Sequence, residues 1–436
     1  MKKPSITILY HFFHPDNVVS ARQFSDLARE LAYRGWDVTV LTSNRYWQHS
    51  EAKIPIADEI WNGVHIIRVP RLGWNQANDI LRIGNSLQMM TGWILKLLQL
   101  PPTDVVLVGS DPQFSQLIFP AIKKLIRPKL LVHWCFDLFP DAILASGTRG
   151  PVRWLAKLTQ QAVKRTYQSV DLMVDIGPCM RRRLNQYNHN ARCETLTPWA
   201  LLEPRAPERP DPAARQALFG DASLALLYSG NMGKAHDFVP FLHLARVLRR
   251  IDPRIMFCFA CRGNRLTELK EAITPQDENV RIADFSDESE LRKRLNAADI
   301  HLLSLRPEWT GVVVPSKFFG SLAVGKPVIY AGPEFSSIAG WIREFDVGLV
   351  MTQDNFRTVI EELLRISRSP DVLASWQRNA MQTYQDNFSK RIVMDAWNSV
   401  LRTELQGNMH EWSRNLSVVG ERQPARSSRT VENVRR

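Results

Sequence analysis

Short apolar runs alternate with longer amphipathic segments along most of the chain. In the first half the runs are ITILYHFF (6–13), DVTVLTS (37–43), GVHIIRVP (63–70), DVVLVGS (104–110), KLLVHWCFD (129–137) and VDLMVDIG (170–177). Between the first two runs, Phe24, Leu27 and Leu31 fall on one helical face, and Gly35 can end the helix. Apolar runs separated by helices predict a parallel sheet that is buried on both faces.

A proline-rich segment interrupts this alternation, because LLEPRAPERPDPAARQALFG (201–220) contains four prolines. The alternation then resumes with LALLYSG (224–230), IMFCFACRG (255–263), NVRIADF (279–285), IHLLSL (300–305), KPVIYAG (326–332) and DVGLVM (346–351). A long helical stretch from Phe356 to about Leu405 follows.

The expected fold is therefore α/β, with two Rossmann-like, doubly wound domains that face a central cleft. The expected boundaries are residues 1–202 for the first domain, 203–221 for a Pro-rich linker and 222–380 for the second domain. Residues 381–406 would form a C-terminal helix that can pack back on the first domain. Residues 407–436 lack periodicity and are expected to be a disordered basic tail.

Composition limits the class of protein. With 436 residues and 44% hydrophobic content, the chain suits two or three domains. No apolar run approaches the roughly 20 residues of a membrane-spanning helix, and the N-terminus reads as a strand, not a signal peptide. Five cysteines are few and odd in number, which favours a reducing cytoplasm. The spacing of Cys258 and Cys261 in a strand points them to opposite faces, as two core residues.

The net charge of +12 is unevenly distributed. Residues 1–200 contain 24 Lys/Arg against 15 Asp/Glu, and residues 407–436 contain six Arg against three Glu. A basic N-terminal half suits an anionic membrane surface or a polyanion. No recognised nucleic-acid motif accompanies the charge, so nucleic acid is not the expected partner.

Two amphipathic segments bear on the membrane question. The stripe in 87–102 consists of Met89, Met90, Trp93, Ile94, Leu97 and Leu98, and it can lie on a bilayer or in the core. The basic residues in 153–168 are Arg153, Lys157, Lys164 and Arg165, and they can face a bilayer or water.

The segment GVVVPSKFFGSLAVGKPVIYAG (311–332) places a hydroxyl and a cation where a short helix begins. Pro315 ends the Val run, and Ser316 is expected to cap the helix with its hydroxyl oxygen. The free amides and the helix dipole favour an anion there, whereas Lys317 adds a charge that the dipole alone would disfavour. The pattern predicts an anion-binding site; the alternative is an ordinary capped helix with a solvated lysine.

A second loop, GNMGK (230–234), follows the first apolar run of the second domain. Its glycines allow close backbone approach to a ligand, and Lys234 can meet a phosphate. Neither the dinucleotide nor the Walker A fingerprint is present. Two lysine-bearing loops in one domain predict a diphosphate site made of Gly230, Asn231, Gly233, Lys234, Ser316 and Lys317.

Five segments together resemble the family 4 glycosyltransferases of the GT-B fold. They are HFFHPDNVVSARQFSDLARELAYRGWDVTVLTS (11–43), FDLFPD (136–141), TPW (197–199), YSGNMGKAHD (228–237) and VPSKFFGSLAVGKPV (314–328). The closest likeness is to bacterial exopolysaccharide, colanic-acid and O-antigen sugar transferases, over roughly residues 5–400.

The resemblance implies retaining transfer of a sugar from a nucleotide sugar, without a metal or another cofactor. The second domain would hold the nucleotide and the first domain the acceptor. Lys234 matches the phosphate-binding lysine of the family, and Ser316 and Lys317 match its Pro-Ser-Lys. Asn231 stands where many members have an arginine.

The resemblance is weakest at the glutamates that bind ribose in many members. Gly320 replaces one, and the other, expected near Val312, is absent. The nucleotide or sugar would instead meet Arg262, Gly263, Gly320, Glu308 and Glu334.

In the first domain, the loop after the first strand would meet the acceptor through Asn17, Ser20 and Arg22. The expected catalytic residues are Asp137, His14 and Asp16, with Asp137 preferred by family analogy; the alternative for His14 is a hydrogen-bonded loop residue. The expected acceptor is a lipid-linked sugar or other saccharide, used in the cytoplasm at the anionic inner leaflet. A non-catalytic scaffold, a nucleotide-sugar epimerase and a nucleic-acid binder are the rival functions.

Overall fold

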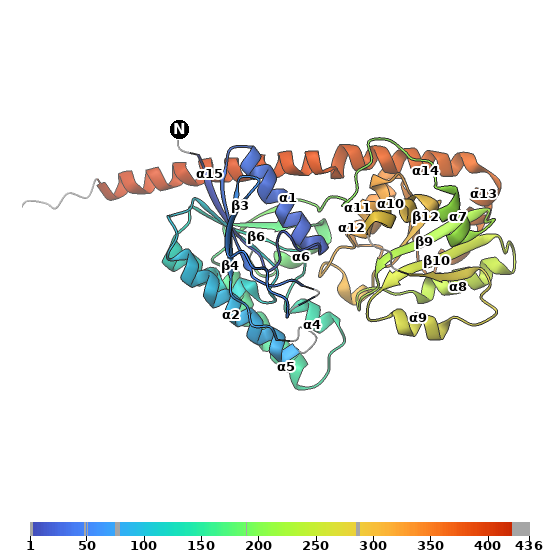
Figure 1. The fold of residues 1–436 in the computed structure, drawn as a ribbon, viewed down its shortest axis with the longest axis horizontal. Coiled ribbons are helices and arrows are strands. Elements are labelled where there is room, and N and C mark those ends of the chain that lie inside the picture. Colours follow the sequence, from blue (N-terminus) through green and yellow to red (C-terminus); the bar gives the residue numbers. More distant parts are fainter. Residues whose placement is uncertain are drawn as a thin grey trace, which may run out of the picture.

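A computed structural model describes residues 3–47, 49, 51–74, 79–188, 190–284 and 288–420, which form two α/β domains lying next to each other (Figure 1). The described part of the first domain contains an eight-stranded sheet in the order β3-β4-β2-β1-β5-β6-β7-β8. Its strands are β1 (Ser5–Leu9), β2 (Asp37–Ser43), β3 (Asp58–Trp61), β4 (Val64–Val69), β5 (Val105–Gly109), β6 (Leu130–Trp134), β7 (Leu172–Asp175) and β8 (Arg192–Thr195).

Every pairing in this sheet is parallel except β3 with β4. The sequence reasoning missed β3, although Asn62 and Gly63, both at positive φ, form the turn of a hairpin. The helical segments are α1 (Val19–Tyr33), α2 (Asp79–Leu97), a 3₁₀ turn (Ser115–Ile118), α3 (Phe119–Ala121), a π-helical turn (Ile122–Ile126), α4 (Asp141–Ala145), α5 (Pro151–Tyr167) and α6 (Pro178–Leu184).

The second domain has a six-stranded sheet over its described residues, in the order β11-β10-β9-β12-β13-β14, and all its pairings are parallel. Its strands are β9 (Leu224–Asn231), β10 (Ile255–Arg262), β11 (Val280–Ala283), β12 (Ile300–Ser304), β13 (Val328–Ala331) and β14 (Gly348–Met351). The expected α/β class and two doubly wound domains are confirmed.

The helices of this domain cover both faces of the sheet. They are α7 (Pro212–Phe219), α8 (Val239–Arg249), α9 (Leu266–Ala272), α10 (Glu288–Ala297), a 3₁₀ turn (Pro307–Trp309), α11 (Lys317–Ala323), α12 (Ser337–Phe345), α13 (Phe356–Arg368) and α14 (Pro370–Thr383). Cys258 packs with Phe219 on one face of β10, and Cys261 packs with Tyr228 on the other. The alternation of side chains along the strand therefore places the two thiols on opposite faces, as predicted.

The structure divides the C-terminal half differently from the sequence pattern in two places. Pro212 begins α7 inside the expected linker, because proline is well tolerated in the first turn of a helix and Asp211 caps it. The long helical stretch is broken between α13 and α14, where Pro370 follows, and again at a π-helical turn (Tyr384–Phe388).

The last described helix, α15 (Lys390–Gly420), follows the second domain in sequence but packs along the first (Figure 1). Its buried stripe is Val393, Met394, Trp397, Leu401 and Leu405. Trp397 meets the edge of Trp134 with ring centroids 4.9 Å apart. The sequence pattern predicted a disordered tail from residue 407, but residues 407–420 belong to α15. The remaining residues of the expected tail, 421–436, lie outside the described part.

The stripe on α2 belongs to the core. Met89, Met90, Trp93 and Leu97 are buried, so the structure selects the core alternative over the bilayer for these residues. Among the helices that the structure describes, none is long and apolar enough to cross a membrane.

Candidate active site

A cavity of about 240 Å³ lies between the two domains, and we call it the interdomain cavity. The first domain and the chain that leaves it contribute Val19, Trp199, Ala200, Leu201 and Leu202. The second domain contributes Leu227, Ser229, Gly230, Asn231, Arg262, Leu291, Leu295, His301, Leu302, Ser316, Lys317, Gly320 and Ser321. Asn231 and Arg262 end the parallel strands β9 and β10, and the carboxyl ends of strands are the usual ligand position in a doubly wound fold.

Lys317 is held in the wall of this cavity by two hydrogen bonds. Its Nζ donates to the carbonyl oxygen of Asn231 at 2.8 Å and lies 3.3 Å from Nε2 of His236. Because an ammonium cannot accept, Nε2 of His236 accepts and its Nδ1 donates to the carbonyl oxygen of Ser304. Burial lowers the pKa of Lys317 to about 8, and burial together with Lys317 lowers the pKa of His236 to about 3. The pair therefore holds a single positive charge at neutral pH.

Two glycines let the backbone approach these groups closely. Gly230 has φ +124°, and a Cβ there would lie 2.8 Å from Cε of Lys317. Gly263 has φ +117°, and a Cβ there would lie 2.4 Å from Oδ1 of Asn231. A Cβ at Gly320, in contrast, would meet nothing within 4 Å. Only the first two positions therefore require glycine on steric grounds.

The charge of the interdomain cavity is positive. Arg262 and Lys317 line it, and none of its described lining residues is acidic. Arg294 lies behind the wall, where its Nε donates to Oγ of Ser229 at 3.1 Å. This arrangement suits an anionic ligand. Across the described residues there is no cluster of three His, Cys, Asp or Glu that could hold a metal ion.

The structure brings six of the predicted donor-site residues to this cavity: Gly230, Asn231, Arg262, Ser316, Lys317 and Gly320. Ser316 precedes α11 as expected, but its backbone is already helical and its hydroxyl makes no capping hydrogen bond. The predicted cap is therefore wrong, and the side chain lies at the cavity wall.

The other predicted donor residues lie outside the lining. Lys234 is exposed in the turn after Asn231, and Gly233 and Gly263 lie near Asn231. Glu308 is exposed in the 3₁₀ turn, and Glu334 pairs with Arg343 at 3.0 Å.

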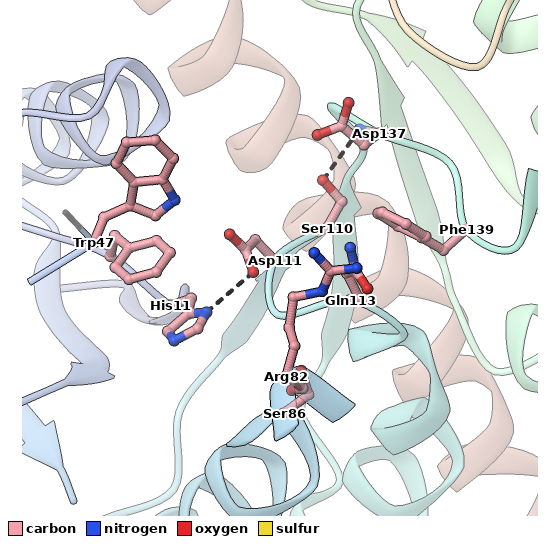
Figure 2. Close-up of a pocket in the computed structure, with 10 residues that line it drawn as sticks. His11, Trp47, Arg82, Ser86, Ser110, Asp111, Gln113, Asp137 and Phe139 are labelled. Atoms are coloured by element: carbon pink, nitrogen blue, oxygen red, sulfur yellow. Dashed lines mark hydrogen bonds and ion pairs between the residues drawn. The ribbon is translucent and has the colours of Figure 1, made fainter. Parts of the chain in front are cut away.

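A second cavity, of about 520 Å³, lies within the first domain, and we call it the first-domain cavity (Figure 2). Its lining residues are His11, Phe12, Trp47, Arg82, Ser86, Ser110, Asp111, Gln113, Asp137 and Phe139. They follow β1, β2, β5 and β6 or lie on α2, so the cavity sits at the carboxyl edge of the sheet. The loop that begins with His11 and Phe12 reaches the interdomain cavity at Val19 and therefore connects the two sites.

Asp137, the preferred catalytic candidate, opens into the first-domain cavity (Figure 2). Its backbone N–H and that of Phe136 donate to Oγ of Ser110 at 3.2 and 3.1 Å. Partial desolvation by the surrounding protein and the nearby Asp111 raise the pKa of Asp137 to about 6, although the residue is exposed at the cavity surface. Sequence reasoning missed His11 and Asp111, although both directly follow strands that are neighbours in the sheet.

The remaining predicted residues of the first domain line neither cavity. His14 stacks on Trp61 with centroids 4.2 Å apart, and burial lowers its pKa. The carboxylate of Asp16 accepts from the backbone N–H of Trp47 at 2.6 Å, so Asp16 supports a residue that does line the first-domain cavity. Asn17 lies in the loop between β1 and α1, and Ser20 and Arg22 lie in the first turn of α1.

Comparison with known proteins supports the resemblance. Residues 20–199 match the Glycosyl transferase 4-like domain family. A probable glycosyltransferase of Pseudomonas aeruginosa, WbjE, is 23% identical over 307 residues, which are 69% of this chain and 74% of that protein. A sucrose-phosphate synthase from Thermosynechococcus elongatus superposes with a TM-score of 0.71, at 12% identity, over 93% of this chain and 100% of that one. HepE from Anabaena, solved in complex with UDP, superposes with a TM-score of 0.61, at 11% identity, over 92% and 100% of the chains.

Proposed function

We propose that this chain is a family 4 glycosyltransferase and that it transfers a sugar from a nucleotide-sugar donor to a lipid-linked or other saccharide acceptor. Its likeness to the Glycosyl transferase 4-like domain family over residues 20–199, to WbjE and to solved GT-B glycosyltransferases supports the proposal. The positive interdomain cavity carries the proposal, since a nucleoside diphosphate brings negative charge to Arg262 and Lys317. The similar HepE is solved with UDP, which agrees with this class of ligand.

In this proposal, breaking the bond between the sugar and the diphosphate puts negative charge on the leaving group. Lys317 and Arg262 would stabilise that charge, and Lys234, in the adjoining turn, would reach the phosphates as the family resemblance implies. An acceptor hydroxyl would attack the anomeric carbon from the face that the diphosphate leaves. Attack on that face gives retention of configuration, and a phosphate oxygen of the leaving group would take the hydroxyl proton.

We place the protein at the cytoplasmic face of the inner membrane on the basis of an exposed face of α5. Trp154, Leu155 and Leu158 are 64%, 57% and 48% exposed, beside the exposed basic residues Arg153 and Lys157. The ion pairs found among the described residues do not include these two cations. Exposed apolar side chains flanked by unpaired cations match an anionic bilayer surface. There the apolar side chains leave water and the cations approach anionic headgroups, and both changes are favourable.

The surface continues onto α2, whose outer side exposes Ile83, Leu87 and Leu95, and onto Leu98, which directly follows this helix. Both helices contact the 3₁₀ turn Ser115–Ile118, and both lie along the lower edge of the first domain in Figure 1. Arg82 and Ser86 of α2 line the first-domain cavity, so a membrane on this surface would lie next to it. A lipid-linked acceptor could then present its sugar without leaving the bilayer.

The test is nucleotide binding by calorimetry with UDP, GDP, ADP and dTDP, followed by mass spectrometry of products after each matching sugar nucleotide is offered with a lipid extract. We expect one nucleotide to bind, and Lys317→Ala to weaken it about 10- to 100-fold, the range for a lost charged hydrogen bond. The matched control is Lys270→Ala, an exposed lysine on α9. No nucleotide binding would favour the scaffold, and conversion of the donor without an acceptor would favour the epimerase.

A further inference from the structure

We propose that Asp111 binds a hydroxyl group of the acceptor sugar in the first-domain cavity, and that His11 and Arg71 position it for this role. The inference rests on the proposed function and adds to it the group that recognises the acceptor. The observation behind it is a chain of hydrogen bonds from a buried arginine through a buried histidine to a carboxylate at the cavity wall.

The donors and acceptors in this series of hydrogen bonds can be assigned in only one way. Nη1 of Arg71 lies 3.2 Å from Nε2 of His11, and Nδ1 of His11 lies 3.0 Å from Oδ1 of Asp111 (Figure 2 shows the second contact). A guanidinium can only donate, so Nε2 of His11 must accept. The imidazole is therefore neutral, its proton is on Nδ1, and that N–H donates to Asp111.

The guanidinium of Arg71 lies over the Phe12 ring, 5.7 Å from its centroid, and makes few hydrogen bonds besides the one to His11. Its side chain is almost wholly inaccessible, with the residue 2% exposed, and burial followed by Arg45 lowers its pKa to about 10, which leaves it charged at neutral pH. Its Nη2 reaches the carbonyl oxygen of Tyr46 at 3.4 Å, whereas its Nε is buried without a hydrogen-bond partner in the described structure. The nearby carboxylates of Asp111 and Asp16 offset part of the cost of burying this cation, and its hydrogen bond to His11 fixes the tautomer of the imidazole.

Packing also fixes the orientation of the imidazole. The His11 ring stacks on Phe12 with centroids 3.9 Å apart, and the His11 backbone N–H donates to the carbonyl oxygen of Asp111. Its carbonyl oxygen accepts from Oγ1 of Thr42 at 3.0 Å. Asp111 itself is 36% exposed in its side chain and opens into the cavity. The series of hydrogen bonds therefore begins at fixed side chains in the protein interior and ends at a carboxylate that is accessible to solvent in the cavity.

The cavity walls fit a saccharide. Flat aromatic rings come from Phe12, Trp47 and Phe139, and hydrogen-bonding groups come from Ser86, Ser110, Gln113, Arg82, Asp111 and Asp137. Aromatic faces pack against the C–H faces of sugars, and carboxylates and amides pair with their hydroxyl groups. A carboxylate whose position is already fixed binds a hydroxyl with less loss of entropy than a mobile one.

The experiment measures glycoside binding in full-length protein saturated with UDP, or with the nucleotide that binds best. The probes are p-nitrophenyl glycosides of common hexoses, observed by saturation-transfer NMR. We expect at least one to bind, and Asp111→Asn, which keeps the side-chain shape, to weaken it about 10-fold or more, since a charged hydrogen bond is lost. Nucleotide affinity should not change. Glycoside binding that survives D111N, or no glycoside binding to a wild-type protein that binds nucleotide, would overturn the inference.

The positioning role has its own readout. Arg71→Lys keeps a donor for Nε2 of His11, so glycoside affinity should stay within about threefold; Arg71→Met removes the donor, so affinity should fall toward that of D111N. The ¹⁵N shifts of the His11 ring should report the Nδ1–H tautomer in wild type and R71K, and a mixture in R71M. Equal losses in R71K and R71M with an unchanged tautomer would mean a packing role only. A wild-type protein that binds no nucleotide would count against the proposed function, which distinguishes that failure from a failure of the Asp111 inference.

Discussion

Gly230 and Gly320 line the same cavity, but their surroundings predict opposite responses to alanine. Gly230→Ala puts a Cβ at positive φ and against Lys317, so we expect it to lower the free energy of unfolding by about 1–3 kcal/mol. Gly320→Ala has open space and lies inside α11, so it should raise that free energy by up to about 1 kcal/mol. Urea denaturation measures both, and equal changes would contradict the geometry.

Lys317 predicts how donor binding depends on pH. Its pKa is lowered to about 8 by burial, so the free protein carries the charge below that pH and loses it above. Nucleotide affinity should therefore be full near pH 7 and should fall as the pH rises through about 8, by up to tenfold per pH unit for one required proton. Lys317→Arg is the control, because a guanidinium stays charged and should flatten the profile. A wild-type profile that is flat to pH 9.5 would remove Lys317 from the phosphate site.

At the scale of elements, the exposed face of α5 predicts how the protein meets a membrane. Full-length protein should float with vesicles of phosphatidylcholine and phosphatidylglycerol, less with phosphatidylcholine alone, and less at high salt. The double substitution Arg153→Gln and Lys157→Gln should lower the membrane partition coefficient about 30-fold, because each cation contributes about 1 kcal/mol to binding.

The apolar part of this surface needs a matched control. Trp154→Ser should also reduce flotation, whereas Tyr33→Ser, which removes an aromatic residue that is 87% exposed on α1, should not. Equal flotation with and without anionic lipid would reject the docking surface.

Hydrophobic periodicity predicted helices and strands well where a pattern was compatible with only one structural environment. The buried strands β5 and β12 fall inside predicted apolar runs, and β1 and β9 each extend one residue beyond theirs, since both faces of a parallel sheet are covered. The stripe on α2 had two meanings, core or bilayer, because burial against protein and against lipid need the same residues. Composition could not divide the helices after Phe356, where the break depends on a single proline and a local π-helical turn.

The candidate site was predicted less completely, because its parts come from distant segments. The GNMGK and PSK loops were recognisable, and the structure joins them through the hydrogen bond from Lys317 to Asn231. Which lysine lines the cavity depends on where each turn points, which spacing does not encode. The contacts of His11 with Asp111 and Arg71 span 100 and 60 residues, so only the folded sheet edge brings them together.

At the scale of the whole molecule, the chain passes between the domains twice and the two passages are joined. The first passage contains Ala200 and Glu203, and the second runs from Tyr384 to Lys390. The hydroxyl of Tyr384 accepts from the backbone N–H of Ala200 and donates to Glu203, whose carboxylate also accepts from the backbone N–H of Lys390 at 2.7 Å. Relative motion of the domains must therefore bend both passages together.

The packing of α15 has a consequence for anyone who divides this protein. A fragment that stops at residue 202 would lack the helix that covers Trp134 and would expose the groove that Trp397 fills. The natural halves are thus discontinuous: residues 1–202 need the C-terminal helix, supplied as a separate peptide or moved ahead of the first strand by circular permutation. In that rearranged order each lobe would be one uninterrupted stretch, and the polypeptide would cross the cleft once.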